Sequence, residues 1–268
     1  MKLSVFYHHI LEAANQTGYA VEDVLSKCVQ AGIQAVEMDL YHFDESINHL
    51  QLLKDAGIKT ACVNNHYAME KEFNEAQAIA HIRSAVTSGA MKILVVPGYL
   101  SAEEGDALSA VIHDRKATAG FLRNCPTAVK IAEGLRRITE LASKEGVTVT
   151  VEDFDNVSSP LSGLNALLWY LEEVPGLKCT FDTGNFVTHN DDLYIAWSAL
   201  KNYVTHVHVK DRGTGPVAIG DGNLPCGDIL RIISEADTAQ YMAIEHYGAP
   251  DQLNYILRSA SYINSLAL

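Results

Sequence analysis

The chain has 268 residues, a length that suits one large domain or two small ones. Its 48% hydrophobic content excludes a disordered chain, and its formal net charge of −13 argues against a nucleic-acid partner, because surfaces that bind nucleic acid are normally basic. Five scattered cysteines without a C-x-x-C pair, an N-terminus unlike a signal peptide and the lack of a long apolar run predict a cytoplasmic protein with no disulfides and no membrane contact.

Short apolar segments alternate with helix-like patterns from one end of the chain to the other. Eight segments rich in β-branched and aromatic residues are predicted as strands, at 3–7, 35–40, 59–65, 92–97, 147–153, 178–184, 204–210 and 241–247. Between them, apolar residues recur at three- and four-residue spacing, as at Ile131, Leu135 and Ile138, which is typical of one-sided helices. Five of the strands are preceded by a glycine that can end the helix before it, at positions 32, 57, 89, 146 and 176.

Eight strands, each followed by a helix, predict an α/β fold, a single (β/α)8 TIM barrel that spans residues 1–268. The alternative, a doubly wound open sheet, usually has a glycine-rich phosphate loop after its first strand, and HHILEAANQTGY contains none. The connection after the fourth strand, at about 98–125, is unusually long. Because it leaves the strand at the end where barrel active sites lie, it is predicted as a loop that covers the active site.

The seventh predicted strand, VTHVHVK, alternates valines with polar residues. His206, His208 and Lys210 occupy every second position and therefore share one face. In a closed barrel this face is expected to point at the barrel axis, whereas Val207 and Val209 would pack against the surrounding helices. His206 lies deeper than His208, which indicates a supporting or core role for its imidazole.

Three of the last four predicted strands, the fifth, sixth and eighth, carry carboxylates at the same end: Glu152 in VED, Asp182 in FDTGN and Glu245 in IEHY. Together with His208 they give four successive strands that each offer one ionisable side chain. Converging carboxylates repel one another and raise each other's pKa, and a divalent cation removes that repulsion. Three carboxylates and one imidazole suit Mn²⁺, Mg²⁺, Co²⁺ or Zn²⁺, so the sequence predicts one divalent metal ion.

This set of four motifs resembles the xylose isomerase-like barrel superfamily, which includes sugar phosphate isomerases/epimerases, ketose 3-epimerases and hydroxypyruvate isomerases. The segment IGDGNLP and the first strand SVFYHH are also similar to that group. The resemblance implies that Glu152, Asp182, His208 and Glu245 hold the metal and that the substrate is a small carbohydrate. It further implies that Glu152 and Glu245 are the catalytic residues, one removing and the other returning a proton while the metal stabilises an enediolate.

The chain differs from the ketose 3-epimerases at three positions where those enzymes have residues that bind the first hydroxyl groups of a free ketose. Ser158, Asn185 and Thr214 stand where that group has glutamate, histidine and arginine. The activity expected is therefore an isomerase or epimerase acting next to a carbonyl of a small sugar, sugar phosphate or hydroxy-carbonyl compound. One alternative is a metal-dependent dehydratase of an inositol-derived ketone, and another is a barrel that binds a sugar without turnover. A third, an endonuclease IV-like enzyme, is disfavoured by the acidic net charge.

Five residues are predicted to contact the substrate at the barrel mouth: Tyr7, His66, Asn185, Lys210 and Arg212. Tyr7 ends the first predicted strand and is expected to form a pocket wall. Lys210 and Arg212 are cations that suit a phosphate or carboxylate group of the substrate. A salt bridge within the protein is an equally weighted interpretation for both. For Glu37, in the second strand, a substrate contact and a salt bridge within the protein are likewise the two interpretations. The substrate, the native metal and the choice between a monomer and a homo-oligomer stay open.

Overall fold

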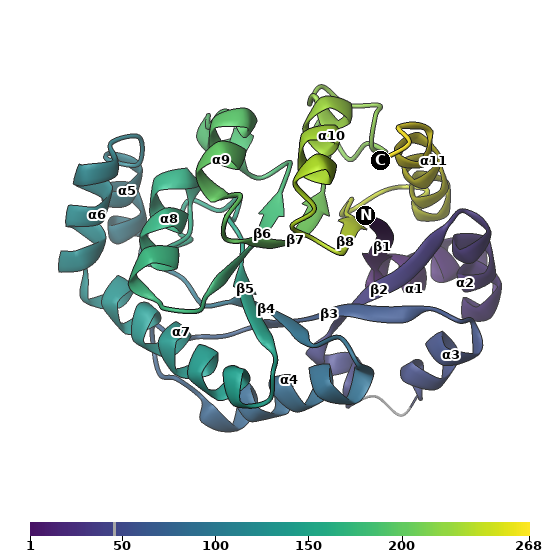
Figure 1. Cartoon of the computed structure of the whole chain (residues 1–268), viewed down its shortest axis with the longest axis horizontal. Coiled ribbons are helices and arrows are strands. Elements are labelled where there is room, and N and C mark those ends of the chain that lie inside the picture. Colours follow the sequence, from purple (N-terminus) through teal and green to yellow (C-terminus); the bar gives the residue numbers. More distant parts are fainter. Residues whose placement is uncertain (45–46) are drawn as a thin grey trace.

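The computed structural model describes residues 1–44 and 47–268 of the chain. Eight parallel strands pair in chain order, and β1 pairs with β8, so the sheet closes into a barrel around the centre of Figure 1. The strands are β1 Lys2–Phe6, β2 Ile33–Asp39, β3 Lys59–His66, β4 Lys92–Val96, β5 Thr148–Val151, β6 Lys178–Asp182, β7 Val204–Val209 and β8 Tyr241–Ile244. The predicted α/β fold, a TIM barrel, is confirmed.

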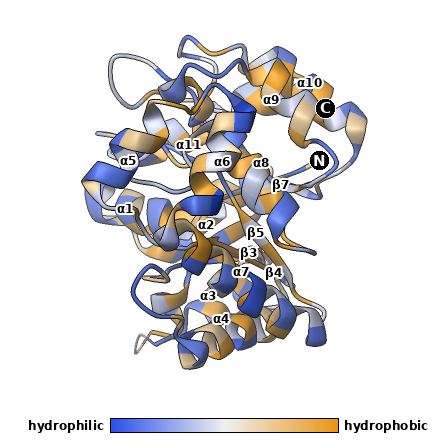
Figure 2. Ribbon diagram, turned by 90° about the vertical axis from the view of Figure 1, so that its left-hand side faces the viewer, coloured by the Kyte–Doolittle hydropathy of each residue, from blue (hydrophilic) through white to orange (hydrophobic). Residues whose placement is uncertain are grey.

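Helices surround the barrel as an outer layer (Figure 1). In the described residues the α-helices are α1 Tyr7–Thr17, α2 Val21–Gln30, α3 His49–Asp55, α4 Glu75–Ser88, α5 Ala102–Ser109, α6 Arg115–Asn124, α7 Pro126–Lys144, α8 Gly163–Glu173, α9 Leu193–Leu200, α10 Cys226–Ala236 and α11 Gln252–Ser265. Two short 3₁₀ helices, η1 Leu40–Phe43 and η2 Phe186–His189, follow β2 and β6. In Figure 2 the strands β3 to β5 are mostly hydrophobic, as expected for a sheet covered by helices.

The connection at 98–125 is not the loop that the sequence predicted, because it contains α5 and α6. Ser101 and Glu104 form a capping box that begins α5, and the Asp114 side chain caps α6. Both helices are therefore locally specified. α6 packs against α7 and α8, and in Figure 1 the pair lies at the periphery beside α8 and not across the barrel centre.

No helix within residues 1–44 and 47–268 combines the length and the apolar composition that crossing a lipid bilayer requires.

Candidate active site

Four polar side chains meet at the carboxyl ends of β5 to β8. Glu152 directly follows β5, Asp182 ends β6, His208 lies in β7 and Glu245 directly follows β8. All four are buried, and each offers one ligand atom that lies within 4.8 Å of the ligand atoms of the other three. The structure therefore brings together the four residues that the sequence singled out, here called the rim quartet.

The quartet is held by contacts with β7. His208 Nδ1 lies 2.8 Å from Glu152 Oε2 and 3.3 Å from Glu245 Oε2. Lys210 Nζ lies 2.5 Å from Glu245 Oε1 and 3.3 Å from Asp182 Oδ2. The other Asp182 oxygen, Oδ1, accepts hydrogen bonds from the backbone N–H groups of residues 184 (2.6 Å) and 185 (3.1 Å). These bonds fix the carboxylate so that Oδ2 faces the other members of the quartet.

The quartet fits a divalent cation. Glu152 Oε2, Asp182 Oδ2 and His208 Nδ1 are buried, and among the described residues they make ion-pair contacts with one another or with Lys210 but no well-directed hydrogen bond. Unsatisfied buried polar atoms are costly, by about 1–3 kcal/mol each, so a cluster of them points to a missing partner. Ligands at about 2.1 Å from one ion lie roughly 3–4 Å from each other, which matches the contacts in the quartet. Carboxylate oxygens with one imidazole are also a donor set for divalent ions.

Burial and charge act in opposite directions on these groups. Burial favours the neutral form of Glu245, but Lys210 and His208 together outweigh it and lower the pKa of Glu245 below its usual range. Burial would likewise lower the pKa of Lys210, yet Asp182 and Glu245 raise it above that of a free lysine. For Asp182 burial prevails over the attraction of Lys210, and the pKa of Asp182 is raised. Lys210 and His208 thus favour the ionised form of Glu245.

A second buried network, formed by Glu37, His206 and Lys92, lies deeper in the barrel and contacts His208. Glu37, in β2, is fully buried, and its carboxylate accepts hydrogen bonds from His206 Nε2 at 2.5 Å and from His208 Nε2 at 3.1 Å. Lys92 Nζ lies 3.4 Å from the other ring nitrogen of His206. Because His208 donates through Nε2, its Nδ1 is turned toward the quartet. This geometry agrees with the supporting role expected for His206 and with the salt-bridge interpretation of Glu37.

The same network shifts the pKa of two of its members. Burial lowers the pKa of His206 to about 4, although the carboxylate of Glu37 opposes the shift. Burial alone would raise the pKa of Glu37, but the two histidines outweigh it and lower that pKa below its usual range. Glu37 is therefore ionised while His206 is neutral.

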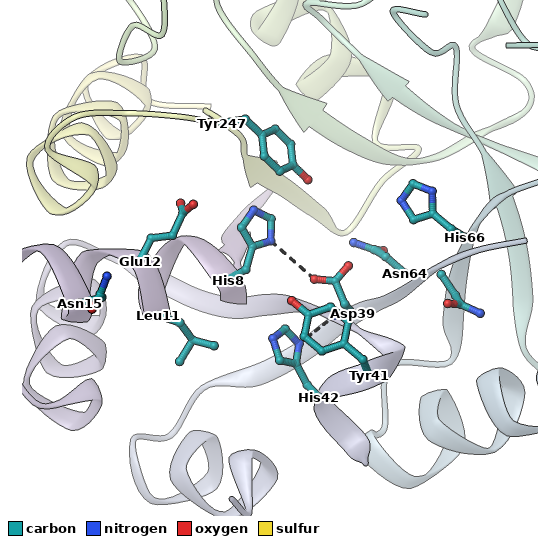
Figure 3. A pocket seen from close by; sticks show the side chains of 11 residues that line it. His8, Leu11, Glu12, Asn15, Asp39, Tyr41, His42, Asn64, His66 and Tyr247 are labelled. Carbon is teal, nitrogen blue, oxygen red and sulfur yellow. Dashed lines mark hydrogen bonds and ion pairs between the residues drawn. The ribbon is translucent and has the colours of Figure 1, made fainter. Parts of the chain in front are cut away.

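A cavity of about 680 Å³ opens beside the quartet, over the ends of β1, β2, β3 and β8 (Figure 3). Its lining includes His8, Asp39, Asn64, His66 and Tyr247. The ring of Phe6 contacts residues of both, since its centroid lies 5.0 Å from that of His208, in the quartet, and 6.0 Å from that of Tyr247, in the cavity lining. This volume is within the usual range of small-molecule sites.

Of the predicted substrate contacts, His66 lines this cavity but Tyr7 does not. Tyr7 is fully buried, and its hydroxyl is 2.9 Å from His49 Nδ1 in the layer between barrel and helices. This corrects the expectation that Tyr7 forms a pocket wall. The physical reason is that β1 ends at Phe6 and α1 begins at Tyr7, so the chain turns and the next residue, His8, faces the cavity instead.

The remaining predicted contacts gather on the other side of Tyr247. Lys210 and Arg212 line a second cavity of about 320 Å³ that shares Tyr247 with the first. Asn185 Oδ1 accepts hydrogen bonds from Lys210 Nζ (2.9 Å) and Arg212 (3.1 Å). Arg212 also donates to Asp155 at 2.6 Å. Both cations are therefore engaged by protein groups.

Of the residues that line the larger cavity, sequence reasoning predicted only His66 as a substrate contact. His8, Asp39 and Asn64 stand at or just beyond the carboxyl ends of β1, β2 and β3. Their position at strand ends was the signal that could have identified them, as it did for the rim quartet.

Comparison with known proteins supports the barrel. A family model described as xylose isomerase-like TIM barrel matches residues 25–266. No match was found among curated protein sequences. Among solved structures, the probable 3-DHS dehydratase AsbF from Bacillus anthracis has a TM-score of 0.73 at 15% identity, over 98% of this chain and 99% of that one.

Two further solved structures share the fold. A sugar phosphate isomerase/epimerase from Parabacteroides distasonis has a TM-score of 0.71 at 15% identity, over 98% of this chain and 96% of that one. A xylose isomerase-like TIM barrel protein from Mycobacterium smegmatis, in complex with magnesium, has a TM-score of 0.61 at 14% identity, over 90% and 86% of the two chains. Likenesses at this level of identity show the fold alone.

Proposed function

The chain belongs to the xylose isomerase-like TIM barrel family, and from that membership and the rim quartet we propose that it is a divalent-metal-dependent isomerase or epimerase. It moves a proton at a carbon next to the carbonyl of a small sugar, sugar phosphate or hydroxy-carbonyl compound. The observation that carries this proposal is the convergence of four buried ligand atoms, one each from Glu152, Asp182, His208 and Glu245, within 4.8 Å of one another.

The four residues of the rim quartet have two roles in this proposal, metal binding and proton transfer. Glu152, Asp182, His208 and Glu245 would hold the ion, and Asp182 and His208 are each fixed by a second contact, to backbone N–H groups and to Glu37 respectively. Glu152 and Glu245 reach His208 Nδ1 from the ends of β5 and β8, and the two proton transfers are assigned to them. One accepts the proton and the other returns it. The bound cation supplies Lewis-acid stabilisation of the charge that develops on the substrate oxygens.

Lys210 supports the proton transfer without touching the reacting carbon. Its ammonium acts together with His208 to lower the pKa of Glu245, which favours the ionised carboxylate that can accept a proton. The magnesium complex of the Mycobacterium smegmatis protein supports a divalent ion in this family. The metal of this chain is proposed to be Mn²⁺, Mg²⁺, Co²⁺ or Zn²⁺.

A dehydratase is the second candidate. It is the alternative that the sequence left open, and the probable dehydratase from Bacillus anthracis shares this fold over nearly the whole of both chains, so the fold is compatible with that reaction. The two reactions begin with the same proton abstraction and differ in whether a β-hydroxyl group then leaves.

Incubation in D₂O tests the proposal. The Mn²⁺-loaded protein is mixed with a panel of ketoses, ketose phosphates, hydroxypyruvate and inosose, and NMR follows deuterium at carbon. Exchange with at least one compound, lost after chelation, is expected, and a product with one water less would select the dehydratase. Absence of exchange and of turnover across the panel would contradict the proposed function.

A further inference from the structure

The larger cavity contains polar atoms that the protein leaves unsatisfied. Asn64, in β3, is only 6% exposed, and its Oδ1 has no hydrogen-bond partner among the described residues. His8 Nε2 is also buried without a partner, although His8 Nδ1 lies 3.6 Å from Asp39 Oδ2. Figure 3 shows the side chains of His8, Asp39 and Asn64 directed toward one space. Such atoms indicate a site that receives its hydrogen bonds from a ligand.

The acceptors in this cavity match hydroxyl groups. Asn64 Oδ1 can only accept, and Asp39 and Glu12 add carboxylates to the lining. A hydroxyl group can donate to such an acceptor, whereas a phosphate or carboxylate cannot. Tyr247 stacks on His8, with ring centroids 4.9 Å apart, and gives the cavity an apolar wall.

The charge of the cavity is unsuited to an anion. Its described lining contains two carboxylates and three histidines but no lysine or arginine. Lys210 and Arg212 line the neighbouring cavity, on the other side of Tyr247, and are engaged by Glu245 and Asp155 respectively. A phosphate that entered would meet Asp39 and Glu12 without the bidentate cation that usually binds it.

We propose that this cavity is a subsite for the uncharged, polyhydroxylated end of the substrate, so that the enzyme acts on a free sugar in preference to a sugar phosphate. The inference rests on the proposed function, because it takes the rim quartet as the reacting centre. Phe6 would contact both parts of the site, with the carbonyl end at the quartet and the remaining hydroxyls over β1 to β3. Asn64 is then a specificity-determining residue.

Binding to the Mn²⁺-loaded protein tests the inference. Free ketopentoses and ketohexoses are compared pairwise with their terminal phosphate esters, by saturation-transfer NMR and calorimetry. At least one free ketose is expected to bind about 10-fold or more tightly than its phosphate, since losing a good polar match costs about this much. Tighter binding of the phosphate esters, or no binding of any free ketose, would overturn the subsite.

A substitution at Asn64 tests whether the preference for free ketoses arises in this cavity. Asn64→Leu keeps the side-chain size but removes the acceptor, and is expected to raise the Kd of the free ketose about 10-fold while leaving Mn²⁺ affinity and the melting temperature near those of the parent. Asn254→Leu, on the exposed side of α11, is the control and should leave all three unchanged. Equal ketose binding by Asn64→Leu would contradict the assignment. Proton exchange seen only with phosphate esters would defeat the inference but leave the proposed function standing.

Discussion

Glu37 and His208 are joined inside the barrel by a hydrogen bond of 3.1 Å, from His208 Nε2 to Glu37 Oε2, although they are 171 residues apart in the chain. Both side chains are fully buried. Since this bond occupies Nε2, the remaining nitrogen of His208 is the one that reaches Glu152 and Glu245. The deeper residue Glu37 thus determines how the rim presents its only imidazole ligand.

Replacing this carboxylate should weaken metal binding without removing a ligand. In Glu37→Gln the amide can accept from only one of the two histidines and turns its NH₂ group toward the other. Mn²⁺ affinity, measured by calorimetry, is expected to fall about 10- to 100-fold. Glu133→Gln, which replaces an exposed carboxylate on α7, is the matched control. An unchanged affinity in a folded Glu37→Gln protein would refute the role of Glu37.

The two proposed catalytic carboxylates should each be essential. Glu152→Gln and Glu245→Gln keep the size of the side chain but remove the base, so proton exchange into substrate is expected to fall by about 10²–10⁴-fold. Circular dichroism should show an intact barrel in both variants. Because Asp155 lies outside the quartet and pairs with Arg212, Asp155→Asn serves as a comparison with near-normal exchange. Wild-type rates in either glutamine variant would rule out the mechanism with two carboxylates.

His81 should make the protein less stable in mild acid. It is fully buried in α4, where Nε2 donates to the Val63 carbonyl at 2.9 Å and Nδ1 accepts from the Tyr67 hydroxyl, 3.0 Å away. Burial lowers its pKa from 6.5 to about 4, although the Val63 bond opposes the shift. The unfolded chain therefore binds this proton at a higher pH than the folded one, and this contribution to stability is lost as pH falls from 6.5 to 4.

The size of that loss is on the order of 3 kcal/mol for a shift of this extent. His81→Gln can keep polar contacts at this place but does not titrate, so its urea-unfolding free energy should decline less steeply between pH 6.5 and 4. Parallel declines in the wild type and the variant would show that His81 is not the group responsible.

The barrel and the rim quartet were predictable because they follow from local periodicity. Alternation in β7 put His206, His208 and Lys210 on one face, and the ends of parallel strands must lie at one rim. Both arguments need only the order of elements. The partner of Glu37 could not be found in this way, because β2 and β7 are far apart in the chain and meet only when the barrel closes.

The errors arose at element boundaries. Phe6 precedes α1 without a side-chain capping bond, so the sequence carried no helix-start signal, and Tyr7 was assigned to the strand. At 98–125 the signals were present, in Ser101 with Glu104 and in Asp114, but α5 and α6 are short and were read as loop. Neither error affects the quartet, whose members belong to β5 to β8.

The number and place of bound ions test the central claim most directly. A crystal grown with Mn²⁺ and examined by anomalous diffraction should show one peak per chain, within about 2.5 Å of an atom from each of Glu152, Asp182, His208 and Glu245. A peak elsewhere, no peak at saturating Mn²⁺, or three ions in the barrel mouth would contradict a single catalytic ion held by these four side chains.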